Sequence, residues 1–253
     1  MKVLAKVFRV IEILKNNKGM KLGDISAQLD IPKSTIYRIL DELIKNKYAY
    51  KDNNNYRLGF KFVEVSSYII ERFDLRDISK NSIDKLNDLT KETIHLAVLL
   101  EDQMTYIDKR ESMSPIRMVS EIGRSGPIHC TALGKVLLAY QPKKVIDDIL
   151  NNTTLKRFTK NTIVSKELIL KELNNIRRNG YSVDNEEHEK NIGCIASPIF
   201  NNENKIIGSL SISGVLINKK IEEILKYKDF LKSECKKISK RLGFIENGKA
   251  YYC

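Results

Sequence analysis

The chain contains 253 residues, and its 44 Lys and Arg against 32 Asp and Glu give a formal net charge of +12. Hydrophobic residues make up 42% of the chain and charged residues 30%, a balance that supports a packed core and excludes intrinsic disorder. No run of about eighteen apolar residues is present, and charges interrupt the N-terminal segment. We therefore expect a cytoplasmic protein with no membrane partner. The four cysteines show no C-x-x-C spacing, which favours reduced thiols.

Positive charge is concentrated near the N-terminus. Residues 1–60 hold twelve basic and six acidic side chains, so half of the net charge lies in under a quarter of the chain. Such an excess favours an anionic partner such as nucleic acid. The lysines from Lys219 to Lys240 alternate with Ile and Leu at helical spacing, so we interpret them as the solvated face of a helix.

Three amphipathic helices are predicted in the first 45 residues. The first ends at Asn17-Lys18-Gly19, and the second ends before Pro32, which suits the start of the third. Each helix has an apolar stripe at a spacing of three and four residues. These stripes consist of Leu4, Val7, Phe8, Ile11 and Leu14, then Leu22, Ile25 and Leu29, then Ile36, Ile39, Leu40 and Leu43.

A β-hairpin is predicted after the third helix. Two short alternating runs, residues 48–50 and 56–58, flank Asp52-Asn53-Asn54-Asn55, a turn that tolerates left-handed backbone. Three helices with a tight turn between the second and third, followed by a hairpin, are typical of a winged helix-turn-helix over residues 1–57. A small helical subdomain without a nucleic-acid role is the alternative interpretation.

The exposed face of the third helix carries side chains that donate hydrogen bonds to phosphates and base edges. Arg9 of the first helix and two hairpin residues complete the set that we expect to contact DNA. The expected contacts are Arg9, Lys33, Ser34, Thr35, Tyr37, Arg38, Asn54 and Tyr56.

Residues 58–73 predict a linker helix. Its apolar positions are Phe60, Val63, Val65, Tyr68, Ile69 and Phe73. They present more apolar surface than one small domain covers. One recognition helix reads only a few base pairs, so we expect a homodimer, or a dimer of dimers, on palindromic or pseudo-palindromic double-stranded operator DNA.

A longer α/β region is predicted over residues 74–253. The expected helices cover 75–91, 131–140, 142–150, 165–179 and 218–242. The expected strands cover 94–100, 104–110, 116–122, 181–185, 194–200 and 205–213, with a Gly-rich turn at 123–127.

Two segments of this region could line a ligand pocket. The small residues from Cys130 to Gly134 run into a helix N-terminus, where backbone N–H groups and the helix dipole favour an anion such as a carboxylate. Ser211 and Ser213 lie two apart on a predicted strand and therefore share a face. The alternatives are satisfied core hydroxyls, an ordinary turn residue at Asp184 and a small buried hydrophobe at Cys194.

Two longer stretches carry a more specific signature. They are GRSGPIHCTALGKVLLAY at residues 123–140 and GYSVDNEEHEKNIGCIASPIFNNENKIIGSLSISG at residues 180–214. Together with the N-terminal module, they resemble the isocitrate lyase regulator (IclR) family of bacterial transcription factors over nearly the whole chain. The resemblance implies a GAF/PAS-like effector-binding domain that takes a small organic molecule, often a carboxylate.

The resemblance also implies which residues hold the effector, with Met118 expected as an apolar wall and Gly134 expected from the turn described above. The expected effector-binding residues are Met118, Ala132, Leu133, Gly134, Asp184, Ile192, Cys194, Ser211 and Ser213.

An enzyme is the alternative to a regulator. His129 beside Cys130, or Cys194 with His188, could form a thiol–imidazole pair or bind a metal. Neighbouring strand residues point to opposite faces, and the second pair lacks a third ligand at metal spacing. We therefore expect no catalytic residue, metal or cofactor, and favour a DNA-binding regulator, more often a repressor, that an effector controls. An interaction module without DNA binding is a third possibility.

Overall fold

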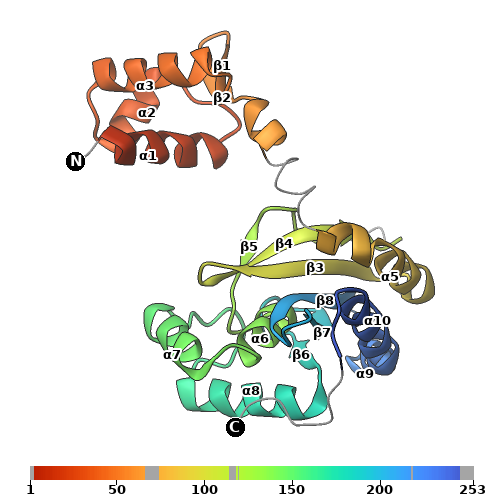
Figure 1. Ribbon diagram of the computed structural model, residues 1–253. Coiled ribbons are helices and arrows are strands. Elements are labelled where there is room, and N and C mark those ends of the chain that lie inside the picture. Colours follow the sequence, from red (N-terminus) through yellow and green to blue (C-terminus); the bar gives the residue numbers. More distant parts are fainter. Residues whose placement is uncertain (1–2, 66–73, 114–117, 119, 218, 246–253) are drawn as a thin grey trace. The chain divides into compact units, whose positions relative to one another are not determined.

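A computed structural model describes residues 3–65, 74–113, 118, 120–217 and 219–245 (Figure 1). The chain divides into two compact units, Met1–Asp74 and Leu75–Cys253. Of the predicted linker helix, residues 61–65 are helical, whereas Tyr68, Ile69 and Phe73 lie outside the described residues.

The first unit has the predicted three helices and hairpin. Its elements are α1 (Val3–Lys15), α2 (Leu22–Leu29), α3 (Lys33–Lys45), β1 (Ala49–Asp52) and β2 (Asn55–Leu58). Asp30 ends α2 in the left-handed conformation, and Pro32 precedes α3 as its N-cap, so the turn between the two helices is short. The predicted apolar stripes of α2 and α3 meet residues from α1 and the hairpin in one buried core. The expected burial of the α1 stripe is wrong for two of its residues, because Leu4 and Phe8 are exposed.

The second unit is built on a six-stranded antiparallel sheet in the order β5-β4-β3-β8-β7-β6. The strands are β3 (Thr93–Leu100), β4 (Gln103–Arg110), β5 (Ser125–Gly126), β6 (Ser182–Asn185), β7 (Ile192–Phe200) and β8 (Ile206–Val215). The central pair, β3 and β8, is far apart in sequence, which makes the middle of the sheet a long-range contact.

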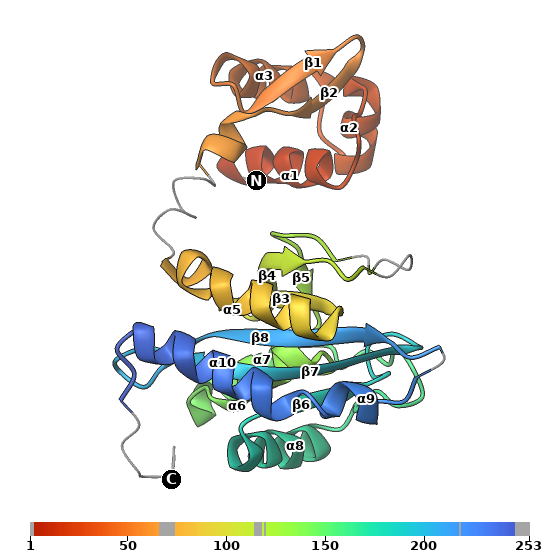
Figure 2. The same cartoon turned by 90° about the vertical axis from the view of Figure 1, so that its right-hand side faces the viewer.

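Helices cover both faces of this sheet (Figure 2). One face packs against α6 (Ala132–Ala139), α7 (Lys143–Asn152) and α8 (Lys166–Asn179). The other packs against α5 (Asp74–Thr90), α9 (Glu222–Leu225) and α10 (Lys228–Arg241). Alternation along β7 divides the two cores, because Ile195 faces α10 and Ala196 faces α6. The architecture is mixed α/β with an antiparallel sheet.

Two predicted elements of this unit are wrong. At described residues 118 and 120–122 the chain is not a strand, and Ser125–Gly126 pairs instead with β4, where the Ser125 and Thr105 hydroxyls lie 3.0 Å apart. The long C-terminal helix is broken at Lys226 and Tyr227 into α9 and α10. The lysines keep a helical spacing on both sides of the break, so the sequence pattern did not indicate that the helix is interrupted.

Candidate functional site

A fully buried helix, α6, brings the predicted pocket residues to the sheet. All eight of its residues are buried. The Thr131 hydroxyl caps it, accepting from the Gly134 N–H at 3.1 Å and donating to the Pro127 carbonyl at 2.7 Å. Among the described residues, no hydrogen-bond acceptor is found for the backbone N–H of Ala132 or Leu133. The first turn of α6 therefore keeps two donors for another group.

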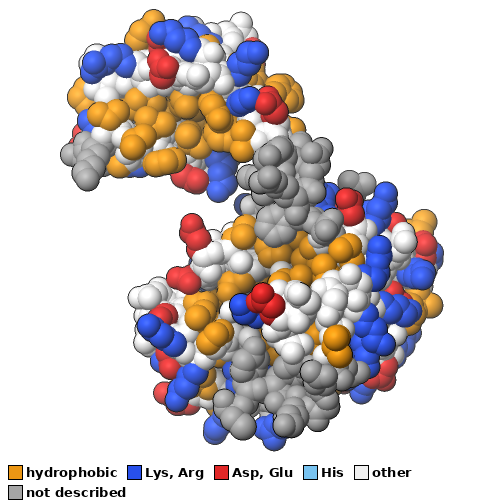
Figure 3. Space-filling view, viewed as in Figure 1, with side chains coloured by type: hydrophobic (Ala, Val, Ile, Leu, Met, Phe, Trp, Pro, Cys, Tyr) orange, Lys and Arg blue, Asp and Glu red, His pale blue; other side chains and the backbone are white. Residues whose placement is uncertain are grey.

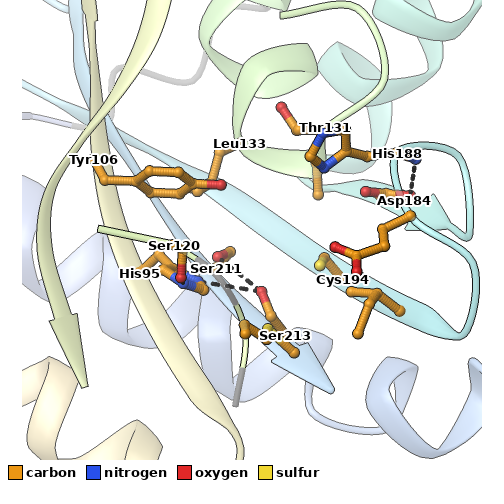
Figure 4. A pocket seen from close by; sticks show the side chains of 14 residues that line it. His95, Tyr106, Ser120, Thr131, Leu133, Asp184, His188, Cys194, Ser211 and Ser213 are labelled. Carbon is orange, nitrogen blue, oxygen red and sulfur yellow. Dashed lines mark hydrogen bonds between the residues drawn. The ribbon is translucent and has the colours of Figure 1, made fainter. Parts of the chain in front are cut away.

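A cavity of about 60 Å³ lies beside this helix end (Figure 4). Its wall combines residues of β3, β4, β6, β7, β8, the start of α6 and the segments that follow β4 and β6. The lining residues are His95, Tyr106, Met118, Ser120, Thr131, Ala132, Leu133, Asp184, His188, Glu189, Ile192, Cys194, Ser211 and Ser213.

Hydrogen bonds join the β3 and β8 sides of the cavity to the segment after β4. His95 lies opposite Ser211 in the strand register. Its Nε2 lies 2.8 Å from the Ser120 hydroxyl, and its Nδ1 lies 3.3 Å from the Ser213 hydroxyl. Ser213 in turn lies 3.4 Å from Ser211. Lys109 donates to the carbonyls of Met118 and Ser120, which holds that segment over the cavity.

The buried groups on this side of the cavity are uncharged near neutral pH. Burial, with the positive charge of Lys109, lowers the pKa of His95 to about 3. Burial, followed by the nearby Cys194, raises the pKa of Tyr106 far above its usual value. These side chains, with the serine hydroxyls, form a neutral hydrogen-bonding wall.

Asp184 lies on the opposite side of the cavity. Its carboxylate accepts from the backbone N–H of Glu187 at 2.7 Å and of His188 at 3.4 Å, which folds the residues after β6 around it. Burial raises the pKa of Asp184 to about 7, although the Glu187 N–H and the charge of Lys135 oppose that shift. Asp184 therefore changes between the acid and the carboxylate near neutral pH.

The structure brings eight of the nine predicted effector residues together in this wall, all except Gly134. The Gly134 N–H is already used by the Thr131 cap, and a Cβ there would lie 2.6 Å from the Ile128 carbonyl oxygen. Glycine here allows the helix to pack closely against the preceding loop, and its contact with an effector stays a prediction. Six lining residues were not predicted as effector contacts: His95, Tyr106, Ser120, Thr131, His188 and Glu189.

The two residue pairs proposed for an enzyme differ in their placement. Cys194 and His188 both line the cavity, whereas His129 and Cys130 do not. Among the residues that the structure describes, no three His, Cys, Asp or Glu side chains are grouped to hold a metal. Burial raises the pKa of Cys130 to about 12, and that of Cys194 rises further, so both thiols are protonated and weakly nucleophilic.

The exposed face of α3 matches the predicted DNA-reading face. Lys33, Ser34, Tyr37 and Arg38 are exposed and Thr35 is partly exposed, while the four apolar stripe residues of the helix are buried. The face therefore combines two cations, two aliphatic hydroxyls and one tyrosine ring. None of these side chains belongs to the apolar stripe that packs in the core.

The other three predicted DNA contacts differ from one another. Asn54 is exposed at the hairpin turn. Arg9 is exposed and donates from Nη2 to the Leu29 carbonyl at 2.9 Å, which ties α1 to the end of α2. The prediction for Tyr56 is wrong, because its side chain is only 6% exposed and belongs to the core of the unit. Tyr56 packs in this core, and its backbone pairs with Met20 in the segment between α1 and α2.

Two family models match this chain. The IclR helix-turn-helix domain matches residues 3–53, and the bacterial transcriptional regulator IclR C-terminal domain matches residues 67–240. The chain belongs to the IclR family. It is a DNA-binding transcriptional regulator of that family, not an enzyme, with an effector-binding domain after its helix-turn-helix.

Relatives in this family match over most of their length. The transcriptional regulator KdgR of Escherichia coli K12 is 36% identical over 241 residues, covering 94% of this chain and 92% of KdgR. The transcriptional repressor AllR of Salmonella typhimurium is 30% identical over 243 residues, covering 95% of this chain and 89% of AllR.

Solved structures of IclR proteins share the fold. The Thermotoga maritima IclR is 34% identical, with a TM-score of 0.77, and the match covers 95% of this chain and 98% of that one. An IclR homologue from Microbacterium hydrocarbonoxydans, solved in complex with 4-hydroxybenzoate, is 23% identical, with a TM-score of 0.82 and coverage of 95% and 99%.

No helix in the described part of this IclR-family chain has both the length and the apolar composition of a membrane span.

The buried His95 predicts a pH-dependent stability. The unfolded chain binds a proton at this residue near pH 6.5, whereas the folded chain binds it only near pH 3. Its contribution is therefore fully present above pH 6.5 and is lost as the pH falls toward 3. Between pH 6.5 and pH 5 the loss should reach about 2 kcal/mol.

Denaturant unfolding of the wild type and His95→Gln across this pH range measures the effect. Asp184 has a raised pKa, so its contribution to stability changes with pH in the opposite direction. Both chains contain Asp184, so this contribution cancels in the comparison. Stability should fall more steeply in the wild type. Parallel pH profiles would contradict an uncharged buried histidine.

Proposed function

We propose that this protein represses transcription from an operator, and that a small organic acid in the cavity changes its operator affinity. The observation that carries the proposal is that Ala132 and Leu133, whose N–H groups have no acceptor among the described residues, line the same cavity as Ser211 and Ser213. These donors suit a carboxylate. We assign residues 1–57 to DNA binding, 58–73 to a linker and 74–253 to effector binding.

The size of the cavity supports a compact effector. One water molecule occupies about 10–15 Å³ by this measure of volume. A cavity of about 60 Å³ therefore holds only a few non-hydrogen atoms before its wall has to move. The Microbacterium homologue, which shares the fold, was solved with 4-hydroxybenzoate, and a carboxylate ligand on the same architecture supports an acid here. The repressor assignment is supported by AllR, a named repressor that is 30% identical.

An exposed apolar surface on the first unit supports a homodimer or a dimer of dimers. On α1, Val3, Leu4 and Phe8 are 72%, 70% and 63% exposed, and Phe60 and Val63 are 83% and 58% exposed. Figure 3 shows hydrophobic side chains gathered on this unit. Apolar patches of this kind mark protein–protein contacts, and two recognition helices are needed to read two half-sites.

Arg38→Ala should weaken operator binding by about 1–3 kcal/mol, because it removes an exposed donor from the reading face while leaving the core stripe intact. Binding is measured by fluorescence anisotropy on an operator duplex at a fixed salt concentration. Tyr56→Phe, in the core of the same unit, serves as the control and should bind as the wild type does. An Arg38 variant with full affinity would exclude this helix face.

Ser211→Ala combined with Ser213→Ala should weaken binding of an acid effector by about 1–3 kcal/mol through the loss of two donors. The acid is found by a thermal-shift screen of small carboxylates, and its affinity is measured by calorimetry. Ser209→Ala is the matched control, because Ser209 lies on the same face of β8 and bonds to the Ser197 carbonyl outside the cavity. Equal affinities in the double variant and the wild type would move the effector site elsewhere.

Leu4→Ser combined with Phe8→Ser should convert the dimer to a monomer, because the two substitutions remove exposed apolar area from the proposed interface. Multi-angle light scattering should give at least twice the 29.1 kDa of one chain for the wild type, and a single-chain mass for the variant. Leu168→Ser, an exposed leucine on α8, is the control. A monomeric wild type, with and without DNA, would refute the assembly.

A further inference from the structure

A lysine is buried inside the effector-binding unit. Lys135 is 1% exposed and lies in α6 with apolar residues on either side of it in the sequence. A buried charge is costly unless it is paired and hydrogen-bonded. Lys135 neither caps α6 nor lines the cavity, so the reason for its burial has to be sought in the groups around its ammonium.

The Lys135 ammonium is held by three groups. It donates to the Val183 carbonyl and forms an ion pair with one carboxylate oxygen of Glu187. A second carboxylate, Glu172 on α8, lies 3.8 Å away. The other Glu187 oxygen is buried and has no partner among the described residues. The buried pair is therefore incompletely satisfied, and such a pair contributes little to stability by itself.

These contacts put the charge directly behind the cavity wall. Lys135 follows Ala132 by three residues and so lies on the same side of α6 as that lining residue. Val183 and Glu187, which hold the ammonium, are the neighbours of the lining residues Asp184 and His188. The Lys135 charge also lowers the pKa values of Asp184 and Cys194, so its field reaches the cavity surface.

An acid ligand would otherwise meet repulsion. Asp184 and Glu189 line the cavity, and Glu187 and Glu172 lie just behind it. The histidines do not offset this negative charge, because burial lowers the pKa values of His95 and His188 and favours their neutral forms. Lys109 lies at the other side of the cavity, where it donates to the carbonyls of Met118 and Ser120. Lys135 is the buried cation that is paired within this acidic group, and in a poorly solvated site a single charge acts strongly on a neighbour.

We propose that Lys135 is a specificity-determining residue of the effector site, whose buried ammonium favours an anionic ligand over a neutral one of the same shape. Glu187 holds the ammonium in place and cancels part of its field. This rests on the proposed effector function, and it assigns the preference for an acid to a residue that does not touch the ligand.

The two members of the ion pair should act in opposite directions. Lys135→Met keeps the length of the side chain and removes the cation, which should lower the affinity for an acid about tenfold. Glu187→Gln keeps the backbone N–H that donates to Asp184. It removes the negative charge that opposes Lys135, so it should raise the affinity for an acid. A residue needed only for folding would lower affinity in both variants.

The experiment uses full-length chains, with pyruvate as the anionic probe and pyruvamide as a neutral probe of the same size. Calorimetry gives both affinities for the wild type, Lys135→Met, Glu187→Gln and the control Lys171→Met, an exposed lysine on α8. Pyruvate affinity should move in opposite directions in the two site variants, while pyruvamide affinity and the control should change little.

A second measurement needs no ligand. Carbon-13 NMR titration of the Asp184 carboxyl uses a negative charge already in the cavity wall as the probe. Its pKa should rise in Lys135→Met and fall in Glu187→Gln. If Lys135→Met fails to fold, Glu187→Gln alone still decides the sign.

The outcomes separate this inference from the function beneath it. Tighter pyruvate binding by Glu187→Gln, with a lowered Asp184 pKa, supports the inference. Weaker or unchanged pyruvate binding with an unmoved Asp184 pKa overturns it, while a wild type that binds the acid keeps the effector function. A wild type that binds neither probe counts against the acid effector, and the carboxyl titration then decides the field of Lys135 by itself.

Discussion

The complete burial of α6 is the constraint on which the effector-binding unit depends. A helix that is buried all round must find a partner for every polar group, because water cannot supply one. The Thr131 hydroxyl caps one end, and Arg177 donates from Nε to the Ala139 carbonyl at the other. Lys135 is paired within the wall. Within the described part of the chain, the N–H groups of Ala132 and Leu133 have no acceptor, and both residues line the cavity.

The antiparallel sheet sets the composition of the opposite wall. Alternation along β3 sends Ile94 and Leu96 into the core beneath α5 and α10, and leaves His95 on the face toward α6. Pairing with β8 then puts Ser211 beside His95. The same two strands therefore supply core residues on one face and hydrogen-bonding residues on the other. A one-residue shift of their register would move both sets of side chains to the wrong face.

Sequence patterns predicted the DNA-binding unit well because its contacts are local. Helical stripes, a proline and an Asn-rich turn determine each element within a few residues of its neighbours. The error at Tyr56 has a simple cause: a four-residue strand alternates, and nothing in the chain says which face of the hairpin packs on the helices. In the second unit, the family resemblance supplied the residues of two continuous segments. His95 and Tyr106 were missed because β3 reaches the site only through its long-range pairing with β8, and β4 follows β3 in a hairpin.

A wall of neutral donors has consequences for a regulator. An arginine in contact with an acid would form two charge-assisted hydrogen bonds and hold it tightly. Here the wall offers hydroxyls, neutral His95 and backbone N–H groups, and the cation lies one layer behind. Such a site gains affinity from preorganised dipoles and shape, with a modest electrostatic bias. An effector can regulate only if it binds the DNA-competent and incompetent states unequally, and a difference of about 1–3 kcal/mol suffices. Hydrogen bonds are directional, so donors that are aligned differently in the two states would give the proposed effector unequal affinities for them.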